Sequence, residues 1–390
     1  MGHQKCQQGI EKDVSEGKMS TAVFTIVSKN YFHFARTLMN SVEKHHPEWH
    51  RFVLLADEVS PDFTYDSSAF ELVPVAKLDI PNFWQFMFRY TILELNTAVK
   101  PYMFDWLFNN KQYDKVIYLD PDIHLYDRME EVISALDAGN LMVLTPHLTE
   151  FLEDGLFPRE VELLKNGIFN LGFLGVSRHK DTDRFIKWWE RKLEYQCLDD
   201  SASGYFVDQK WMDMVTGYFE DFKILRHVGY NIAYWNAIHR KVTKENNKYF
   251  VNGQPLVFFH YSGIDLSRTD ILSRHTNRFT LKDLGPAVEE LYLDYVNKIF
   301  NEGAKNYMKM QYAFRKFCDG TEITNEMRII YRNNLDLIQA CAENPFQHPN
   351  LFRFISLKKR IYLTAKFINS VAKLFLPQSI RNKIKKVIKP

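Results

Sequence analysis

The sequence has few of the features that mark disulfide-linked, zinc-binding or membrane-spanning proteins. Its four cysteines lie far apart and form no Cys-x-x-Cys pair, which argues against a disulfide framework or a zinc site and favours a reducing compartment. No apolar run is long enough to cross a bilayer. Residues 1–18 are polar, without the apolar centre of a secretory signal. We expect them to be a disordered extension or an appended remnant, with Met19 as an alternative start, and we expect a cytoplasmic protein.

Acidic residues are missing from the last part of the chain. None follows Glu343, whereas lysines and arginines continue to the end. Residues 357–375 place apolar side chains along one helical stripe and lysines along another, the pattern of a basic amphipathic helix on an anionic membrane. The alternative is a helix packed on the protein body. We predict a basic amphipathic tail over residues 346–390 that holds the protein peripherally on the inner face of the cell membrane, and no nucleic-acid partner.

The overall composition is that of a globular protein. The chain has 390 residues, of which 46% are hydrophobic and 25% charged, and its formal net charge is +2. This length is ample for a sizeable core and fits one large domain with appendages, or two small domains. We expect a main domain over residues 19–280 and a helical accessory region over residues 281–345.

One stretch, residues 116–125, combines a buried strand with two acidic residues. Val116 to Leu119 form a short apolar run, typical of a strand that is covered on both faces of a parallel sheet. Asp120 and Asp122 follow, and two carboxylates this close repel each other unless a cation or a proton intervenes. At the carboxyl edge of an α/β sheet, where ligands bind, a cation is favoured. The alternative is a turn in which Asp120 caps the next helix.

The segments before this stretch follow a strand–helix–strand order. Residues 22–27, 52–56 and 70–75 are expected strands, and a helix is expected over residues 31–43. Neither Gly-x-Gly-x-x-Gly nor a Walker loop occurs. A nucleotide would therefore need a metal or cationic side chains for its phosphates. This absence also argues against a nucleotidyltransferase on a similar sheet.

The later segments alternate in the same way. Helices are expected over residues 82–95, 100–108, 129–136, 158–164 and 181–195, and strands over residues 141–144, 167–176 and 256–259. A further helix is expected to open at residues 205–211, and residues 281–341 are expected to be mostly helical.

Four short motifs give the chain a resemblance to a known family. In order, they are Tyr118-Leu119-Asp120-Pro121-Asp122, Phe169-Asn170-Leu171-Gly172-Phe173, Asp208-Gln209 and His260-Tyr261-Ser262-Gly263. With these motifs the region from Thr21 to Asp265 resembles the retaining glycosyltransferases of family 8, which include glycogenin and bacterial lipopolysaccharide sugar transferases. The resemblance implies a GT-A fold: an α/β, Rossmann-like, mostly parallel sheet flanked by helices, here with a C-terminal helical extension.

The resemblance also implies a metal centre. Asp120 and Asp122 would hold a divalent cation with His260 as the third protein ligand. Two carboxylates and an imidazole suit Mn²⁺, or Mg²⁺, with diphosphate oxygens and water completing the shell. The alternative for His260 is a core histidine that closes a strand.

Further residues receive donor-binding and catalytic roles from the resemblance. Lys100 would reach the phosphates or the donor sugar, although a solvated surface lysine is the alternative. Asn170 and Gly172 would line the sugar, or form a plain bulge. Asp208 and Gln209 would lie beneath the reacting sugar, with Asp208 as a helix cap in the alternative.

The remaining donor contacts rest on strand ends and on a loop. Ser28 and Asp57, at the ends of the first two strands, are candidates for the base and ribose. Gly263 belongs to the motif that begins with His260. Where the family has Lys-Pro-Trp, this chain has residues 264–268, so Arg268 or Arg274 would contact the diphosphate. Pro121 stands where the family has a small residue.

The expected activity is transfer of a sugar from a nucleotide-diphosphate donor, most simply a UDP-sugar. The acceptor would be a saccharide or a lipid-linked saccharide in surface polysaccharide assembly of the bacterial type. Retention is favoured, with front-face attack and with Asp208 or Gln209 stabilising the oxocarbenium-like sugar. An inverting GT-A enzyme and an inactive GT-A-like binding protein are the alternatives.

Overall fold

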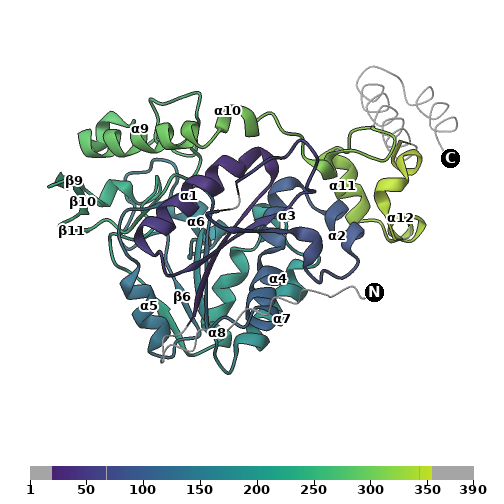
Figure 1. Ribbon diagram of the computed structural model, residues 1–390, viewed down its shortest axis with the longest axis horizontal. Coiled ribbons are helices and arrows are strands. Elements are labelled where there is room, and N and C mark those ends of the chain that lie inside the picture. The colour runs from purple at the N-terminus through teal and green to yellow at the C-terminus, as the bar shows by residue number, and fades with distance from the viewer. Residues whose placement is uncertain (1–19, 67, 342, 354–390) are drawn as a thin grey trace, which may run out of the picture.

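A mostly parallel seven-stranded sheet forms the centre of the protein (Figure 1). The computed structural model describes residues 20–66, 68–341 and 343–353. The strands lie in the order β3-β2-β1-β4-β7-β6-β8. Their bounds are β1 Thr21–Val27, β2 His50–Leu55, β3 Glu71–Pro74, β4 Lys115–Leu119, β6 Met142–Leu144, β7 Phe173–Ser177 and β8 Phe222–Ile224. Strand β7 runs antiparallel to both β4 and β6, and the other neighbours are parallel.

Both faces of this sheet are covered by helices, as the apolar run at residues 116–119 predicts. On β4, Val116 and Tyr118 pack in one core and Ile117 and Leu119 in another, because side chains alternate along a strand. The first core contains helices α2 (Phe83–Arg89), α3 (Ile92–Ala98), α4 (Lys100–Asp105) and α7 (Thr182–Leu193). The second contains α1 (Phe32–His45) and α5 (Glu130–Asp137). The expected α/β fold, with a mostly parallel sheet flanked by helices, is therefore confirmed.

A two-stranded ribbon lies beside the main sheet. Strand β5 (Ile123–Leu125) pairs antiparallel with β12 (Phe258–His260), so that Ile123 is opposite His260. A small sheet of β9 (Val242–Glu245), β10 (Lys248–Val251) and β11 (Gln254–Pro255) precedes β12 in the chain. The sequence analysis predicted β12 from the apolar run at residues 256–259, but it did not predict β5, β9, β10 or β11.

Several expected elements are shorter than their patterns suggest. The apolar run 167–176 was expected to be one strand, but β7 begins only at Phe173, and residues 167–172 form a loop held by the Pro146–Phe169 bridge. The helix expected over residues 82–95 is divided at Tyr90, because Thr91 caps α3 with a capping box to Glu94. The helix expected to open at residues 205–211 begins at Lys210 as a short 3₁₀ turn. Helices α6 (Glu160–Asn166) and α8 (Val215–Tyr218) complete this part.

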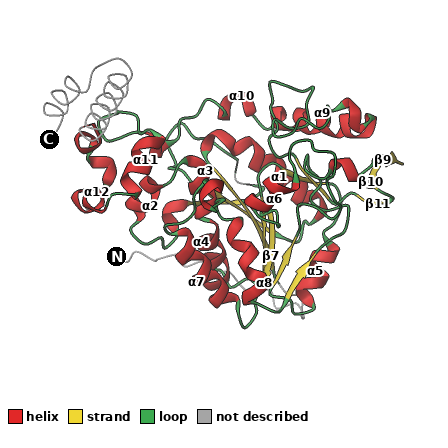
Figure 2. Cartoon of the chain, turned by 180° about the vertical axis from the view of Figure 1, so that it is seen from behind, coloured by secondary structure: helices red, strands yellow, loops and turns green. Residues whose placement is uncertain are grey.

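Residues beyond 281 form helices that pack on the main body (Figures 1 and 2). Helices α9 (Pro286–Asn301) and α10 (Ala304–Tyr307) contact α1, and α11 (Asn325–Arg332) contacts α2. Helix α12 (Leu335–Ala340) follows α11. Buried Arg328 donates to the main-chain oxygens of Met87 and Phe88, so this region shares a core with the helices beside the sheet. The predicted helix at residues 357–375 lies outside the described residues. Among the described helices, none is both long and apolar enough to cross a membrane.

Candidate functional site

The Asp-x-Asp turn lies where β4 ends and β5 begins. The main-chain N–H of Asp120 donates to the Gly172 oxygen at 2.7 Å, and the N–H of Ile123 donates back to the Asp120 oxygen at 3.0 Å. The N–H of Tyr261 donates to the Asp122 oxygen at 2.9 Å. These bonds join the turn to the loop before β7 and to the end of β12, so residues far apart in sequence meet at the carboxyl edge of β4.

The three residues that the resemblance proposes as metal ligands lie together. One ligand atom from each of Asp120, Asp122 and His260 can be chosen so that all three atoms are within 4.8 Å of one another. His260 Nε2 is 3.0 Å from Asp122 Oδ1 and 3.7 Å from Asp120 Oδ2. His260 is buried and the two carboxylates are partly exposed. The cluster is therefore open on the carboxylate side and supported by protein on the histidine side.

The electrostatics of the cluster favour added positive charge. Burial raises the pKa of Asp120, and Asp122 adds to this effect against the opposing influence of Lys100 and His260. Burial alone would lower the pKa of His260, but Asp122 and Asp120 outweigh it and the pKa rises. The Asp120 shift comes mainly from burial and the His260 shift from the two carboxylates, and a proton or a cation among the three groups would relieve both.

Two asparagine side chains fix the orientation of the His260 ring. Its Nδ1 is 3.2 Å from Asn170 Oδ1 and 3.3 Å from Asn231 Oδ1. Both atoms are acceptors, so Nδ1 carries the hydrogen and the Nε2 lone pair of the neutral ring faces the carboxylates. A lone pair directed at two carboxylates is unfavourable unless a cation lies between them or Nε2 takes up a proton.

Gly172 leaves the space that the His260 ring occupies. A Cβ atom at this position would lie 2.4 Å from His260 Cε1 and 2.8 Å from Nδ1. Real contacts between carbon atoms are about 3.5 to 4 Å, so no side chain fits here while the ring holds its place. Gly172 of the second motif is therefore needed to leave room for the ring of His260, which belongs to the fourth motif.

A buried ion pair lies beneath the Asp-x-Asp turn. Lys100 Nζ is 2.5 Å from Asp208 Oδ2, donates to the Leu171 oxygen at 3.0 Å and stands over the Tyr118 ring at 3.9 Å. The Tyr118 hydroxyl in turn donates to Asp120 Oδ1 at 2.5 Å. Burial raises the pKa of Asp208 and Lys100 opposes this shift. The predicted donor lysine is thus paired with the predicted catalytic aspartate in the interior.

Gln209 is bonded to main chain at both ends of its amide. Its Oε1 accepts from the Leu171 N–H at 2.9 Å, and its Nε2 donates to the Asn166 oxygen at 2.9 Å. The amide therefore pins both ends of the loop that carries Asn170. Val207, which precedes the Asp208–Gln209 pair, has a φ of +40°. This conformation is strained for a β-branched residue.

The other predicted donor-binding residues are more dispersed. The Ser28 hydroxyl donates to Asn30 at 2.8 Å. The buried Asp57 carboxylate accepts main-chain hydrogens from Lys29, Glu58 and Ala313. It thereby ties the end of β2 to the C-terminal region. Their contacts with a donor stay predictions.

The loop after His260 carries the last two predicted positions. Gly263 has a φ of +73°, and a Cβ there would lie 2.3 Å from the His275 ring, so glycine is required. Arg268 is exposed and paired with Asp270 at 2.8 Å. Arg274, the alternative cation, is also exposed.

Residues 231–236 supply site residues that sequence reasoning missed. Asn231 has a φ of +53° and donates to Thr145 Oγ1 at 2.9 Å and to Asn170 Oδ1 at 3.1 Å. Trp235 meets the His260 ring edge-on, with centroids 5.3 Å apart. Buried His147 lies 3.3 Å from the Asn170 amide. The one available signal was a pair of asparagines among aromatic residues, since asparagine tolerates positive φ.

The Asp-x-Asp turn thus lies at the edge of a mostly parallel sheet, with His260 beside it. No family model matches the chain. The chain is 26% identical to the uncharacterized protein YfnF of Bacillus subtilis over 287 residues, covering 70% of this chain and 91% of YfnF. It is 21% identical to the uncharacterized protein YfnD of the same organism over 314 residues, covering 77% and 95% of the two chains.

Several solved structures similar to this chain are glycosyltransferases. One is the galactosyltransferase LgtC, in complex with donor and acceptor sugar analogues, with 15% identity, a TM-score of 0.42 and coverage of 71% of this chain and 95% of LgtC. Another is the glycosyltransferase GlyE of Streptococcus pneumoniae, with 14% identity, a TM-score of 0.40 and coverage of 77% and 67%.

Proposed function

We propose that this protein is a metal-dependent glycosyltransferase that takes a sugar from a nucleotide-diphosphate donor. The observation that carries the proposal is the orientation of His260. Its Nδ1 faces two amide oxygens, so its Nε2 lone pair joins Asp120 and Asp122 around one point. This donor set fits a hard or borderline divalent cation such as Mn²⁺ or Mg²⁺. When bound, the cation would neutralise charge that develops on the departing diphosphate.

The buried residues beside the cluster have separate roles in this proposal. Asp208 would keep its negative charge because Lys100 is paired with it. A carboxylate held in a dry, fixed position stabilises positive charge on a sugar without forming a bond to it. Lys100 would act through Asp208, with no direct contact with the phosphates. Gln209 would position the loop that presents Asn170 and Gly172.

The finer parts of the proposal concern mechanism and substrates. We propose transfer with retention, a UDP-sugar as donor, and a saccharide or lipid-linked saccharide as acceptor in surface polysaccharide assembly. Ser28, Asp57, Gly263 and Arg268 are proposed to contact the donor. Attachment to an anionic membrane surface on the cytoplasmic side is proposed for the tail at residues 346–390.

The proposal is tested by release of UDP from a panel of UDP-sugars in the presence of Mn²⁺. We expect one donor to be hydrolysed, chelation by EDTA to abolish release, and Asp122→Asn to lower the rate at least about 100-fold because a ligand is lost. Asp183→Asn, an exposed aspartate at the start of α7, removes the same charge away from the site and should leave the rate unchanged.

Two outcomes would contradict the proposal in different ways. Donor binding without release in the unsubstituted protein would favour the inactive binding protein instead. Release that is equal in Asp122→Asn and the unsubstituted protein would separate the activity from this cluster. Retention is tested by NMR of the product, and an inverted anomeric configuration would refute front-face attack.

A further inference from the structure

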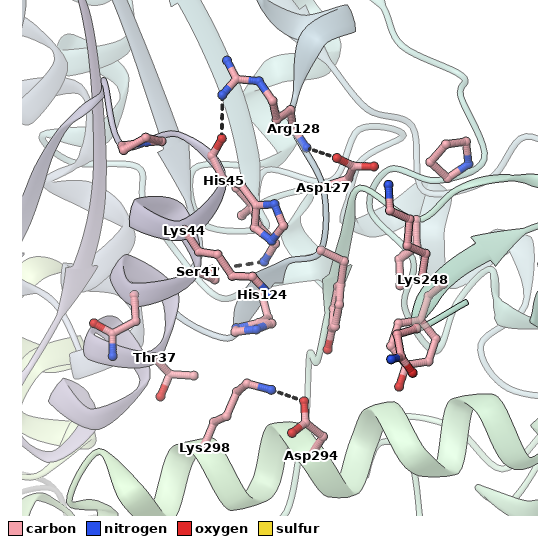
Figure 3. A pocket seen from close by; sticks show the side chains of 18 of the residues that line it. Thr37, Ser41, Lys44, His45, His124, Asp127, Arg128, Lys248, Asp294 and Lys298 are labelled. Atoms are coloured by element: carbon pink, nitrogen blue, oxygen red, sulfur yellow. Dashed lines mark hydrogen bonds and ion pairs between the residues drawn. The ribbon is translucent and has the colours of Figure 1, made fainter. Parts of the chain in front are cut away.

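A cavity of about 1050 Å³ lies apart from the metal cluster. Helices α1 and α9 form two of its walls, and residues 124–128 and the β10–β11 hairpin form the others (Figure 3). Asp120, Asp122 and His260 do not line it. Along the β5–β12 ribbon, His124 and Phe259 share the face opposite to Ile123 and Leu125, which pack in the sheet core. The cavity is therefore on the outer face of the ribbon whose ends carry the proposed metal ligands.

Two of the ammonium groups that line this cavity have no partner within the described residues. Asp294 is already paired with Lys298, and Glu302 with Arg36. By contrast, Lys44 and Lys248 have no ion pair or side-chain hydrogen bond within the described residues. Figure 3 shows them on facing walls of the cavity.

Most of the other charged residues in the lining are held in ion pairs or hydrogen bonds within the protein. Arg128 is held by Glu48 and Glu130, and Asp127 accepts the Arg128 N–H. Among the lining residues, four are lysine or arginine and three are aspartate or glutamate, so the lining carries one net positive charge when its histidines are neutral. The ammonium groups of Lys44 and Lys248 are therefore the positive charges that remain for an anionic ligand to meet.

His124 adds a buried polar group. The residue is only 7% exposed, and its Nδ1 has no hydrogen-bond partner among the described residues. A neutral imidazole offers one donor and one acceptor, and an unpartnered buried polar atom is costly unless a ligand satisfies it.

The uncharged part of the wall combines rings and amides. Tyr126 and Tyr249 contact each other edge-on with centroids 5.8 Å apart, and Asn40, Asn247 and Asn301 supply amide groups. Aromatic faces pack against apolar C–H surfaces, whereas amides and imidazole bind hydroxyl groups. A sugar ring presents both kinds of surface at once.

We propose that this cavity binds an anionic saccharide, a sugar that carries a phosphate or a carboxylate group. Lys44 and Lys248 contact the acidic group, and the tyrosine rings and amides contact the sugar. Tyr126 also connects this cavity to the region of the metal cluster, because its hydroxyl is 2.5 Å from that of Tyr261, the residue next to His260.

Calorimetric titration of the full chain in EDTA tests the proposal. The probes are glucose 6-phosphate, glucuronate, neutral glucose and inorganic phosphate. We expect at least one of the two acidic sugars to bind at least 10-fold more tightly than glucose and than inorganic phosphate, with an affinity that falls as salt is added. Because the chelator removes divalent cations, binding at the proposed donor site through a metal does not contribute. Asp122→Asn should bind the acidic sugar as the unsubstituted protein does.

Matched lysine variants assign any binding to the cavity. The double variant Lys44→Ala/Lys248→Ala should bind the acidic sugar at least 10-fold more weakly and keep its rate of donor hydrolysis. The control Lys77→Ala/Lys165→Ala removes two other exposed lysines and should have no effect. Equal affinities in the two double variants, or no binding of either acidic sugar at millimolar concentration, would overturn the proposal. Inorganic phosphate that binds as tightly as glucose 6-phosphate would overturn the assignment to a saccharide. These outcomes leave the proposed transferase activity untouched.

Discussion

A single methyl group at Gly172 should disable the metal centre without unfolding the protein. In Gly172→Ala the new Cβ would lie 2.4 Å from His260 Cε1 and 2.9 Å from Asn170 Oδ1. A normal carbon contact then requires the imidazole to move by about 1 Å. The glycine has no positive φ, so alanine adds no backbone strain. The His260 ring is therefore the group that must move.

The expected loss can be stated as a metal affinity. Disturbing the groups that orient a metal ligand typically costs about 10- to 100-fold in affinity, and here the ligand itself is displaced. A metal present at 100 times its Kd stabilises a protein by about 2.7 kcal/mol. If affinity falls about 100-fold at the same metal concentration, this stabilisation shrinks to about 0.4 kcal/mol. Urea unfolding with Mn²⁺ and with EDTA measures both values.

The alanine substitution has a matched control in Gly217. A Cβ at this position would meet no atom within 4 Å, and the glycine has no positive φ. Gly217→Ala should therefore keep the full stabilisation by Mn²⁺. If Gly172→Ala also keeps it, the His260 ring does not bind the metal in the position described, and the assignment of the third ligand is wrong.

Two further predictions concern stability. Burial lowers the pKa of His46 to about 4. Protonation therefore favours the unfolded chain, and the stability from this site is complete above pH 6.5 and is lost as the pH falls toward about 4. At pH 5 the loss from His46 is about 2 kcal/mol, and His46→Gln should flatten the pH dependence of urea unfolding between pH 7 and 5; an unchanged slope would contradict this. Arg332→Met should cost about 3 kcal/mol because it leaves the buried Glu94 carboxylate, 3.0 Å away, without its cation. The double variant Glu94→Gln/Arg332→Met should recover part of this loss, and equal stability of the two variants would show that the ion pair is not the cause.

The sheet was predictable because its strands are buried on both faces. The continuous apolar runs in β1 and β4 distinguish them from helices and from half-exposed strands. Strand direction carries no such signal. Phe173 to Ser177 are as apolar as β4, yet β7 is antiparallel. The short β9–β11 strands are partly exposed and lack both a continuous run and a regular alternation, which is why the sequence gives no sign of them.

The candidate site likewise contains some residues that the local sequence predicts and others that it does not. Asp120 and Asp122 are neighbours in sequence, so their convergence follows from local geometry. His260 could be proposed only through the family resemblance, and its orientation depends on Asn231, 29 residues away, which no motif marked. Contacts of this kind arise from strand pairing and loop placement. A single sequence carries no local pattern for them.

The structure determines which group the charge of Lys100 neutralises, whereas the sequence alone leaves this open. The lysine was expected to reach the phosphates or the donor sugar, and in the structure its ammonium group is paired with Asp208. Three carboxylates, those of Asp120, Asp122 and Asp208, therefore share one fixed cation, and two negative charges remain when His260 is neutral. A single proton on His260 would balance only one of them, whereas a divalent cation would balance both. Since Lys100 is committed to Asp208, the uncompensated pair is that of the Asp-x-Asp turn. For this reason we place the cation at Asp120 and Asp122 and give the electrostatic role to Asp208.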